Sequence, residues 1–178
     1  TNEILTGDIH TANQLASGLE TRDQAKTFIY AFLYGAGDAK IGSIVGGTSK
    51  DGKRLKEKFL GNTPSLGRLR ERVAVASGRG YVLGLDGRRV YVRSQHAALN
   101  TLLQSAGAIV MKKALCLLDE YATKWNINYN FIGNIHDEIQ TEVREEKAKV
   151  FGGLATSCVE AAGIYYKLNC PLAGEFKV

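Results

Sequence analysis

Proline is scarce in this chain, with only two residues, Pro64 and Pro171, among 178. Because proline interrupts helices, its scarcity permits long helices over most of the sequence. Cysteine is also rare: Cys116, Cys158 and Cys170 lie far apart and form no Cys-x-x-Cys motif. This spacing argues against a disulfide framework and against a zinc site, and it indicates reduced thiols in a cytoplasmic setting.

Long apolar runs are missing as well. No stretch of about twenty apolar residues occurs, so a membrane span is not expected. The first ten residues, TNEILTGDIH, lack the basic and then apolar segments of a signal peptide. The chain starts at Thr1 rather than methionine, which indicates processing, deliberate truncation or a piece of a longer protein. With 44% hydrophobic and 23% charged residues, the composition suits a soluble globular protein with one sizeable core or two small ones.

The net charge of +5 is spread unevenly along the sequence. Residues 1–93 carry 15 basic and 9 acidic side chains, whereas residues 94–178 carry 8 and 9. A basic first part and a slightly acidic second part suggest contact with a polyanion in one and metal binding or a structural role in the other. The alternative is that the basic helices serve solubility alone.

Residues 21–37, TRDQAKTFIYAFLYGAG, are predicted to form a helix. Thr21 is a good N-cap, and Gln24 three residues later completes a capping box. Gly35 and Gly37 supply a stop signal, and no proline lies between the two ends. The local signals for the start and the end of this helix therefore agree.

Four polar side chains lie at intervals of four residues along this predicted helix and form a single stripe: Arg22, Lys26, Tyr30 and Tyr34. Two cations followed by two aromatic rings with hydroxyls suit a ligand that has phosphates at one end and a flat ring at the other. A nucleotide has this shape. The alternative is an amphipathic helix with a solvated basic side, which is common in soluble proteins.

In the rest of the chain, the spacing of apolar residues alternates between the period of a helix and that of a strand, which predicts an α+β fold that is mainly helical. Further helices are predicted at about 8–18, 38–47, 49–62, 64–78, 96–124 and 144–168. Two β-hairpins are predicted, with turns at Asp86-Gly87 and at His136-Asp137. The basic side chains of the 49–62 helix either contact a phosphate backbone or form a solvated face: Lys50, Lys53, Arg54, Lys56 and Lys58.

Several motifs occur together in one order along the chain. They are DIHT at 8–11, the Arg22, Lys26, Tyr34-Gly35 pattern, GLDGRR at 84–89, HAALNTLLQSAGA at 96–108 and IHDEIQ at 135–140. This series resembles family A DNA polymerases, and most closely the replicative polymerases of short-tailed bacteriophages. The resemblance implies a fingers subdomain at 1–93 and the C-terminal part of a polymerase palm at 94–178, with the two hairpins.

The resemblance also implies roles for individual residues. Asp137 would be a ligand of Mg²⁺, and Glu138 beside it would have a lesser catalytic role. Four side chains would bind the incoming nucleotide, with Lys26 also acting as a general acid: His10, Arg22, Lys26 and Tyr30. In the family, tyrosine at the position of Tyr30 accompanies acceptance of dideoxynucleotides, and phenylalanine accompanies their rejection. Without the resemblance, Asp137 and Glu138 form an exposed acidic turn, and His10 is a histidine near a helix cap.

Contacts with primer–template DNA are implied for five further residues: Tyr34, Gly35, Asn100, Gln104 and His136. Asn100 and Gln104 are four residues apart on one predicted helix. Amide donors at this spacing suit the minor groove, which presents hydrogen-bond acceptors in every correct base pair. On an unassigned helix, both amides would be solvated or capping groups.

One feature of the family is absent from these 178 residues. The family has a second metal-binding aspartate in a motif resembling DxSxxELR upstream of DIHT, and no such motif occurs here. The resemblance therefore implies a chain that is inactive alone and needs the N-terminal half of a polymerase, primer–template DNA and deoxynucleoside triphosphates as partners. Its location would be cytoplasmic, in an infected host cell if a phage encodes it. Two alternatives are a non-catalytic DNA-binding or accessory protein derived from a polymerase, and a generic helical phosphate-binding protein.

Overall fold

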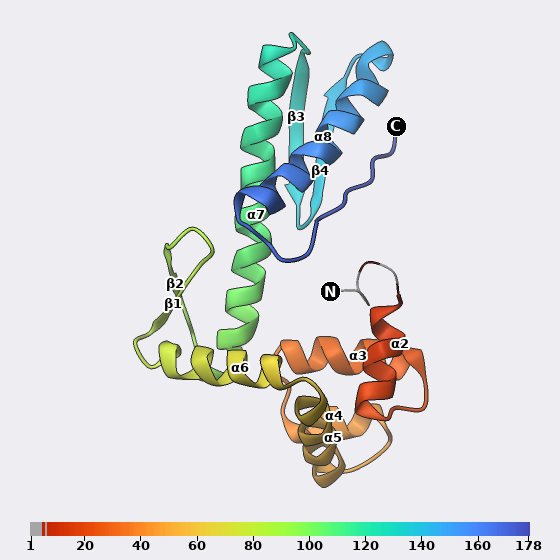
Figure 1. Ribbon diagram of the computed structural model, residues 1–178, viewed down its shortest axis with the longest axis vertical. Coiled ribbons are helices and arrows are strands. Elements are labelled where there is room, and N and C mark those ends of the chain that lie inside the picture. The colour runs from red at the N-terminus through yellow and green to blue at the C-terminus, as the bar shows by residue number, and fades with distance from the viewer. Residues whose placement is uncertain (1–4, 6) are drawn as a thin grey trace. The chain divides into compact units, whose positions relative to one another are not determined.

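The structure of the protein is a computed structural model that describes residues 5 and 7–178 (Figure 1). Thr1, whose position at the start was interpreted as processing, truncation or a piece of a longer protein, lies outside these described residues. The helices are α2 (Ile9–Ser17), α3 (Arg22–Leu33), α4 (Asp38–Ile44), α5 (Ser49–Asn62), α6 (Pro64–Ser77), α7 (Ala98–Lys124), preceded by a short 3₁₀ turn, and α8 (Glu145–Tyr165). The strands are β1 (Tyr81–Leu83), β2 (Arg89–Tyr91), β3 (Tyr129–Ile135) and β4 (Glu138–Val143). The fold is mainly helical with two antiparallel two-stranded sheets, which confirms the α+β prediction.

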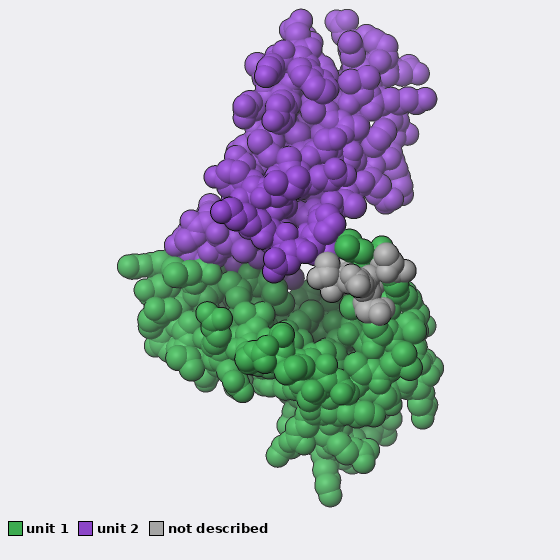
Figure 2. Space-filling model, in the orientation of Figure 1, with its two compact units in different colours: residues 1–83, 89–103 green, residues 84–88, 104–178 purple. Residues whose placement is uncertain are grey.

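The chain divides into two compact units, which Figure 2 draws in different colours. Unit 1 comprises residues 1–83 and 89–103, and unit 2 comprises residues 84–88 and 104–178. The sequence suggested a boundary at residue 93, ten residues before the point where α7 passes from one unit to the other. Helix α7 is continuous across this point, and the predicted division into fingers and palm stays a prediction.

Unit 1 is built around an aromatic core between α2, α3, α4 and α5. Phe28, Phe32 and Phe59 are at most 5% exposed. The ring of Phe59 meets those of Phe28 and Phe32 edge-on, at centroid distances of 5.3 and 5.4 Å. Such edge-to-face pairs are favourable for aromatic rings. The buried face of α3 is therefore fixed, and its opposite face carries the polar stripe.

Two glycines allow α4 and α5 to approach closely. A methyl group on Gly52 would overlap the carbonyl oxygen of Asp38, and one on Gly42 would overlap the carbonyl oxygen of Thr48. Both glycines are buried. Backbone atoms cannot move aside as a flexible side chain can, so glycine is required at both positions.

Gly52→Ala is expected to lower the free energy of unfolding of unit 1 by about 2 kcal/mol, because the added methyl group forces α4 and α5 apart. Gly61→Ala is the matched control in the same helix, since nothing lies within 4 Å of its added methyl group. That control should be neutral or should stabilise by about 0.5 kcal/mol, because alanine favours helix. Urea unfolding followed by circular dichroism measures both, and equal effects of the two variants would contradict the close approach.

A second cluster of unit 1 joins α6, the first hairpin and the start of α7. Val73, Val82, Ala98 and Leu99 are its buried members. Pro64 stands at the first helical position of α6, as predicted, where its missing N–H and fixed φ are suited to a helix start.

Unit 2 packs α7 and α8 against the β3–β4 hairpin. Leu118 of α7, Phe151 and Leu154 of α8 and Ile127 form its core, and the Tyr129 ring of β3 lies 4.9 Å from that of Phe151. The helical segment Gln95–Lys124 is long and apolar enough to cross a membrane by length and composition alone. In the structure, 28% of the most apolar 18-residue window of this segment is buried, and α7 contributes buried residues to clusters in both units.

Candidate nucleotide and metal site

Helix α3 begins as the sequence predicts. The Gln24 N–H donates to Thr21 Oγ1 and the Thr21 N–H donates to Gln24 Oε1, each at 3.2 Å, so the capping box is confirmed. All four stripe residues are at least partly exposed: Arg22, Lys26, Tyr30 and Tyr34. The Tyr30 and Tyr34 rings stack with centroids 6.4 Å apart. The stripe thus presents two cations and then two aromatic rings to solvent.

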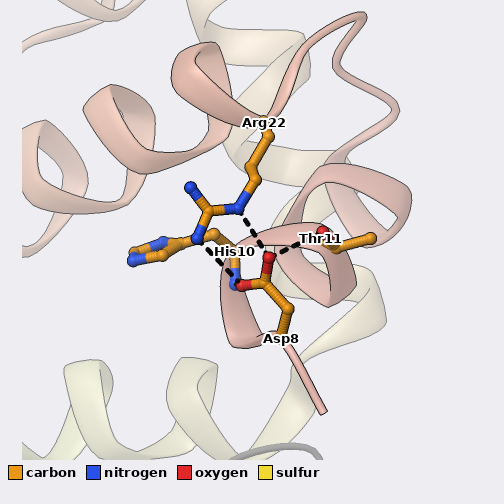
Figure 3. A network of polar contacts seen from close by, with 4 residues as sticks. All are labelled: Asp8, His10, Thr11 and Arg22. Carbon is orange, nitrogen blue, oxygen red and sulfur yellow. Dashed lines mark hydrogen bonds and ion pairs between the residues drawn. The ribbon is translucent and has the colours of Figure 1, made fainter.

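Helix α2 adds a second group of polar side chains beside the first turn of α3 (Figure 3). Asp8 is the N-cap of α2. Its carboxylate accepts a hydrogen bond from the backbone N–H of His10 at 2.9 Å and one from the Thr11 hydroxyl at 3.0 Å. Its carboxylate also accepts two hydrogen bonds from Arg22, from Nε at 2.5 Å and from Nη2 at 3.3 Å. The first residue of the stripe is therefore tied to α2.

His10 lies on the first turn of α2, next to the stripe. Its ring centroid is 6.5 Å from that of Tyr30. The Nδ1 atom of His10 is buried and has no hydrogen-bond partner among the described residues. Unpaired buried polar atoms are uncommon, and this one marks a place where a bound group could supply the missing partner.

Charge is distributed unequally within this group. The Arg22 guanidinium holds the pKa of Asp8 far below its usual range, and Asp8 in turn raises the pKa of Arg22. Both side chains therefore stay ionised at any pH at which an enzyme would be assayed. Among the described residues, no carboxylate forms an ion pair with Lys26. The positive charge of Lys26 is thus available to an anionic ligand.

Gly35 follows the C-cap of α3 with a φ of 78°, a conformation that favours glycine. A methyl group at Gly35 would also overlap the carbonyl oxygen of His96. The backbone geometry alone therefore requires glycine here. The predicted contact of Tyr34 and Gly35 with a template base stays a prediction.

The second candidate group lies in unit 2, at the tip of the β3–β4 hairpin. Ile135 pairs with Glu138 in the ladder, so His136 and Asp137 form the turn, and His136 adopts a φ of 57°. His136, Asp137 and Glu138 are all exposed. The Asp137 side chain has no hydrogen bond or ion pair within the described part of the chain, whereas Glu138 Oε1 accepts from Gln140 Nε2 at 2.8 Å.

This pair of carboxylates fits Mg²⁺ as a partial ligand set. Magnesium prefers oxygen ligands and is commonly bound through one or two carboxylates, with substrate phosphates and water completing the octahedron. Residues 5 and 7–178 contain no group of three or more histidine, cysteine or acidic side chains placed to hold a metal ion. A metal ion held by Asp137 and Glu138 would therefore need further ligands from outside the described residues.

The remaining predicted residues lie on α7. Asn100 is half-buried and belongs to unit 1, whereas Gln104 is exposed and belongs to unit 2. Within unit 1, the structure brings together His10, Arg22, Tyr30 and Tyr34, with Lys26 on the same face of α3. The hairpin carboxylates belong to the other unit.

One residue of the site was missed by sequence reasoning. The sequence placed Asp8 only in the DIHT motif at the start of the helix predicted at about 8–18, but Asp8 also binds Arg22, fourteen residues away. The only sequence signal was the DIHT motif itself, which contains Asp8.

Comparison with known proteins defines the class of this chain. A sequence profile of DNA polymerase family A matches residues 6–178, and the chain therefore belongs to DNA polymerase family A. It is 46% identical to the DNA-directed DNA polymerase of Enterobacteria phage T3 and 45% identical to that of Escherichia phage T7, over 99% of this chain in each case. It is 29% identical over 88% of its length to DNA polymerase I of Aquifex aeolicus (strain VF5).

The fold is also that of a solved polymerase domain. The POL domain of Pol1 from M. smegmatis, solved in complex with DNA primer-template and dNTP, superposes with a TM-score of 0.77 at 20% identity, over 89% of this chain and 32% of that chain. The present chain spans 28% of the length of each phage polymerase and 29% of the Aquifex enzyme. It therefore corresponds to less than a third of these relatives.

Proposed function

We propose that this chain forms the fingers (residues 1–93) and the C-terminal part of the palm (residues 94–178) of a DNA-directed DNA polymerase. The polymerase would add deoxynucleotides to a primer 3′-hydroxyl as a template directs. The observation that carries this proposal is the exposed stripe of two cations and two tyrosines, with His10 beside it, on a chain of this family. If a phage encodes the polymerase, the chain acts in the cytoplasm of the host cell.

The cations of unit 1 suit the triphosphate of the incoming nucleotide. Arg22, Lys26 and His10 would bind its phosphates, and Tyr30, one helical turn beyond Lys26, would lie against the sugar and base. Negative charge grows on the pyrophosphate as it leaves, so a cation held near it stabilises the transition state. Lys26 would also donate a proton to this leaving group.

The hairpin of unit 2 suits the metal. Asp137 would hold Mg²⁺ through a carboxylate oxygen, with Glu138 in a lesser role. When bound, the ion lowers the pKa of the primer hydroxyl and neutralises phosphate charge. Catalysis would need a second metal-binding aspartate that these 178 residues lack, so the N-terminal half of a polymerase would have to supply it.

The DNA would contact both units. Tyr34 and Gly35 would lie at the template base, since an exposed aromatic ring can stack on a base. Asn100 and Gln104 would donate to minor-groove acceptors, and His136 would lie near the primer end. The solved neighbour contains primer–template and dNTP, which supports DNA and nucleotide as partners.

The proposal is tested by mixing this chain with the N-terminal part of a related polymerase. The reconstituted polymerase is this chain mixed with the N-terminal part of the phage T3 enzyme that precedes the matching region. Extension of a labelled primer should require both polypeptides and Mg²⁺. A reconstituted protein that binds primer–template but never extends it would favour a non-catalytic DNA-binding role instead. Equal binding of primer–template and unrelated polyanions would favour a generic phosphate-binding protein.

Lys26→Ala is expected to slow nucleotide incorporation about 100-fold while changing primer–template affinity little, because its charge and proton act on the leaving group as charge develops. Lys40→Ala, at an exposed lysine of α4, is the matched control and should behave as wild type. Single-turnover incorporation and DNA-binding titrations provide the two readouts. Losses of similar size in incorporation rate and in primer–template affinity would indicate that Lys26 contacts the DNA backbone instead.

A further inference from the structure

We infer that Asp8 is a positioning residue for the triphosphate, because one carboxylate holds both the Arg22 guanidinium and the first turn of α2 that carries His10. This inference rests on the proposed function, in which Arg22 and His10 bind phosphates. Asp8 itself would not touch the nucleotide. Its effect would pass through the two groups that it orients.

The carboxylate of Asp8 is fully occupied. Oδ1 accepts from the His10 N–H and Arg22 Nη2, and Oδ2 accepts from the Thr11 hydroxyl and Arg22 Nε. A carboxylate offers about four lone-pair sites, so this one has no capacity left for a metal ion or a substrate group. Its role is therefore structural support of its neighbours rather than direct contact.

The guanidinium of Arg22 keeps most of its capacity. Arginine has five N–H donors, and the two bonds to Asp8 leave about three of them. Figure 3 shows the third nitrogen of the guanidinium directed away from Asp8. The Arg22 side chain is 50% exposed. A phosphate can thus bind Arg22 without displacing Asp8, and it meets a guanidinium whose plane is already fixed by a bidentate contact.

The same carboxylate also sets the position of His10. Its bond to the His10 N–H fixes the first turn of α2, from which the His10 ring extends toward Tyr30. Arg22 and His10 lie on different helices, and Asp8 is the group that bonds to both. Preorganised donors lose less freedom on binding, so they bind a ligand more tightly than mobile ones.

Positioning by Asp8 predicts that its removal weakens nucleotide binding, whereas an effect of its charge alone predicts the opposite. Asp8 is a permanent anion beside a site for a highly charged anion, and Coulomb repulsion alone would weaken nucleotide binding. Removing the charge would then tighten binding. The sign of the change in nucleotide affinity therefore separates positioning from repulsion.

Asp8→Asn is the decisive variant. Its amide nitrogen is a donor and cannot accept from Arg22, so the bidentate contact is lost at almost constant size. Asp23→Asn is the matched control: Asp23 is the next residue to Arg22 and acts on it only through charge. In the reconstituted polymerase, Asp8→Asn should raise the nucleotide KM about tenfold with kcat within a few-fold, as expected for loss of a charge-assisted contact. Asp23→Asn should leave KM within about twofold.

The background of Arg22→Ala tests whether Asp8 acts through Arg22. There, Asp8→Asn should raise KM far less than in wild type, because the partner that it orients is gone. Asparagine is also a good N-cap whose amide oxygen can still accept the backbone N–H of His10, so the loss in Asp8→Asn falls on Arg22. An unchanged effect in both backgrounds, or a fall in KM, would therefore overturn the inference.

A measurement without catalysis separates this inference from the proposed function. The isolated full chain is titrated with inorganic tripolyphosphate, and the ¹H–¹⁵N signal of Arg22 Nε is followed by NMR. Asp8→Asn should expose this N–H to fast exchange and weaken tripolyphosphate binding about tenfold, while Asp23→Asn changes neither. If reconstitution gives no extension, the proposed function fails and this titration decides the inference. Equal binding by wild type and Asp8→Asn would overturn it.

Discussion

Asp137→Asn is expected to abolish primer extension by the reconstituted polymerase while leaving primer–template binding within a few-fold. Asp137 is exposed at the tip of the β3–β4 hairpin, and its side chain bonds to none of the described residues. Its removal should therefore leave folding intact. An amide is a weak Mg²⁺ ligand compared with a carboxylate, and metal-dependent activation of the primer hydroxyl would be lost.

The matched control is Glu142→Gln, an exposed carboxylate on the same hairpin that already accepts a hydrogen bond from Asn130. That variant should extend primers as wild type does. Extension is followed over a range of Mg²⁺ concentrations, and circular dichroism verifies folding. Comparable rates for wild type and Asp137→Asn would refute the metal assignment.

Tyr30→Phe is expected to make the reconstituted polymerase reject dideoxynucleotides by roughly two or more orders of magnitude, while normal synthesis continues. Tyr30 is 47% exposed, one turn along α3 from Lys26 and beside His10. If the phosphates lie on Arg22 and Lys26, the sugar must lie near Tyr30.

The physical reason lies in hydrogen bonding at the sugar. A deoxynucleotide carries a 3′-hydroxyl that satisfies polar groups around it, and a dideoxynucleotide lacks this group. With tyrosine, the side-chain hydroxyl can replace the missing one; with phenylalanine, a polar group is left without a partner. The resemblance to family A polymerases implies the same dependence on this position.

The measurement is the ratio of kcat/KM for deoxy- and dideoxynucleotides in wild type and variant. Tyr91→Phe, at an exposed tyrosine of β2, is the control and should leave the ratio unchanged. A ratio that Tyr30→Phe does not alter would mean that Tyr30 does not face the sugar.

Local features of the fold were predictable from sequence. The capping box at Thr21 and Gln24 acts over three residues, and the turn at His136-Asp137 is set by strand alternation on both sides. The observed helix ends differ from the predicted ends by only a few residues. For example, the helix predicted at 96–124 begins with a 3₁₀ turn at Gln95–Ala97, and α7 follows it. Such features depend on neighbours in the chain, which the sequence displays directly.

Contacts between distant residues were not predictable. Lys56 was grouped with the lysines that contact a phosphate backbone or solvent, but it pairs with Asp38 at 2.8 Å and donates to the Ala36 carbonyl at 2.6 Å. Its side chain is only 14% exposed, so it is a structural residue of the α4–α5 interface. The bond between Asp8 and Arg22 was missed for the same reason, since only the folded chain brings these residues together.

The most direct test of the whole account is single-nucleotide incorporation by the reconstituted polymerase on four primer–templates that differ only in the template base. Each template should direct addition of its complementary deoxynucleotide in the presence of Mg²⁺, and neither polypeptide alone should add any. If the complete mixture binds the primer–templates but adds no nucleotide, or adds the same nucleotide whatever the template base, this chain does not form part of a template-directed polymerase site.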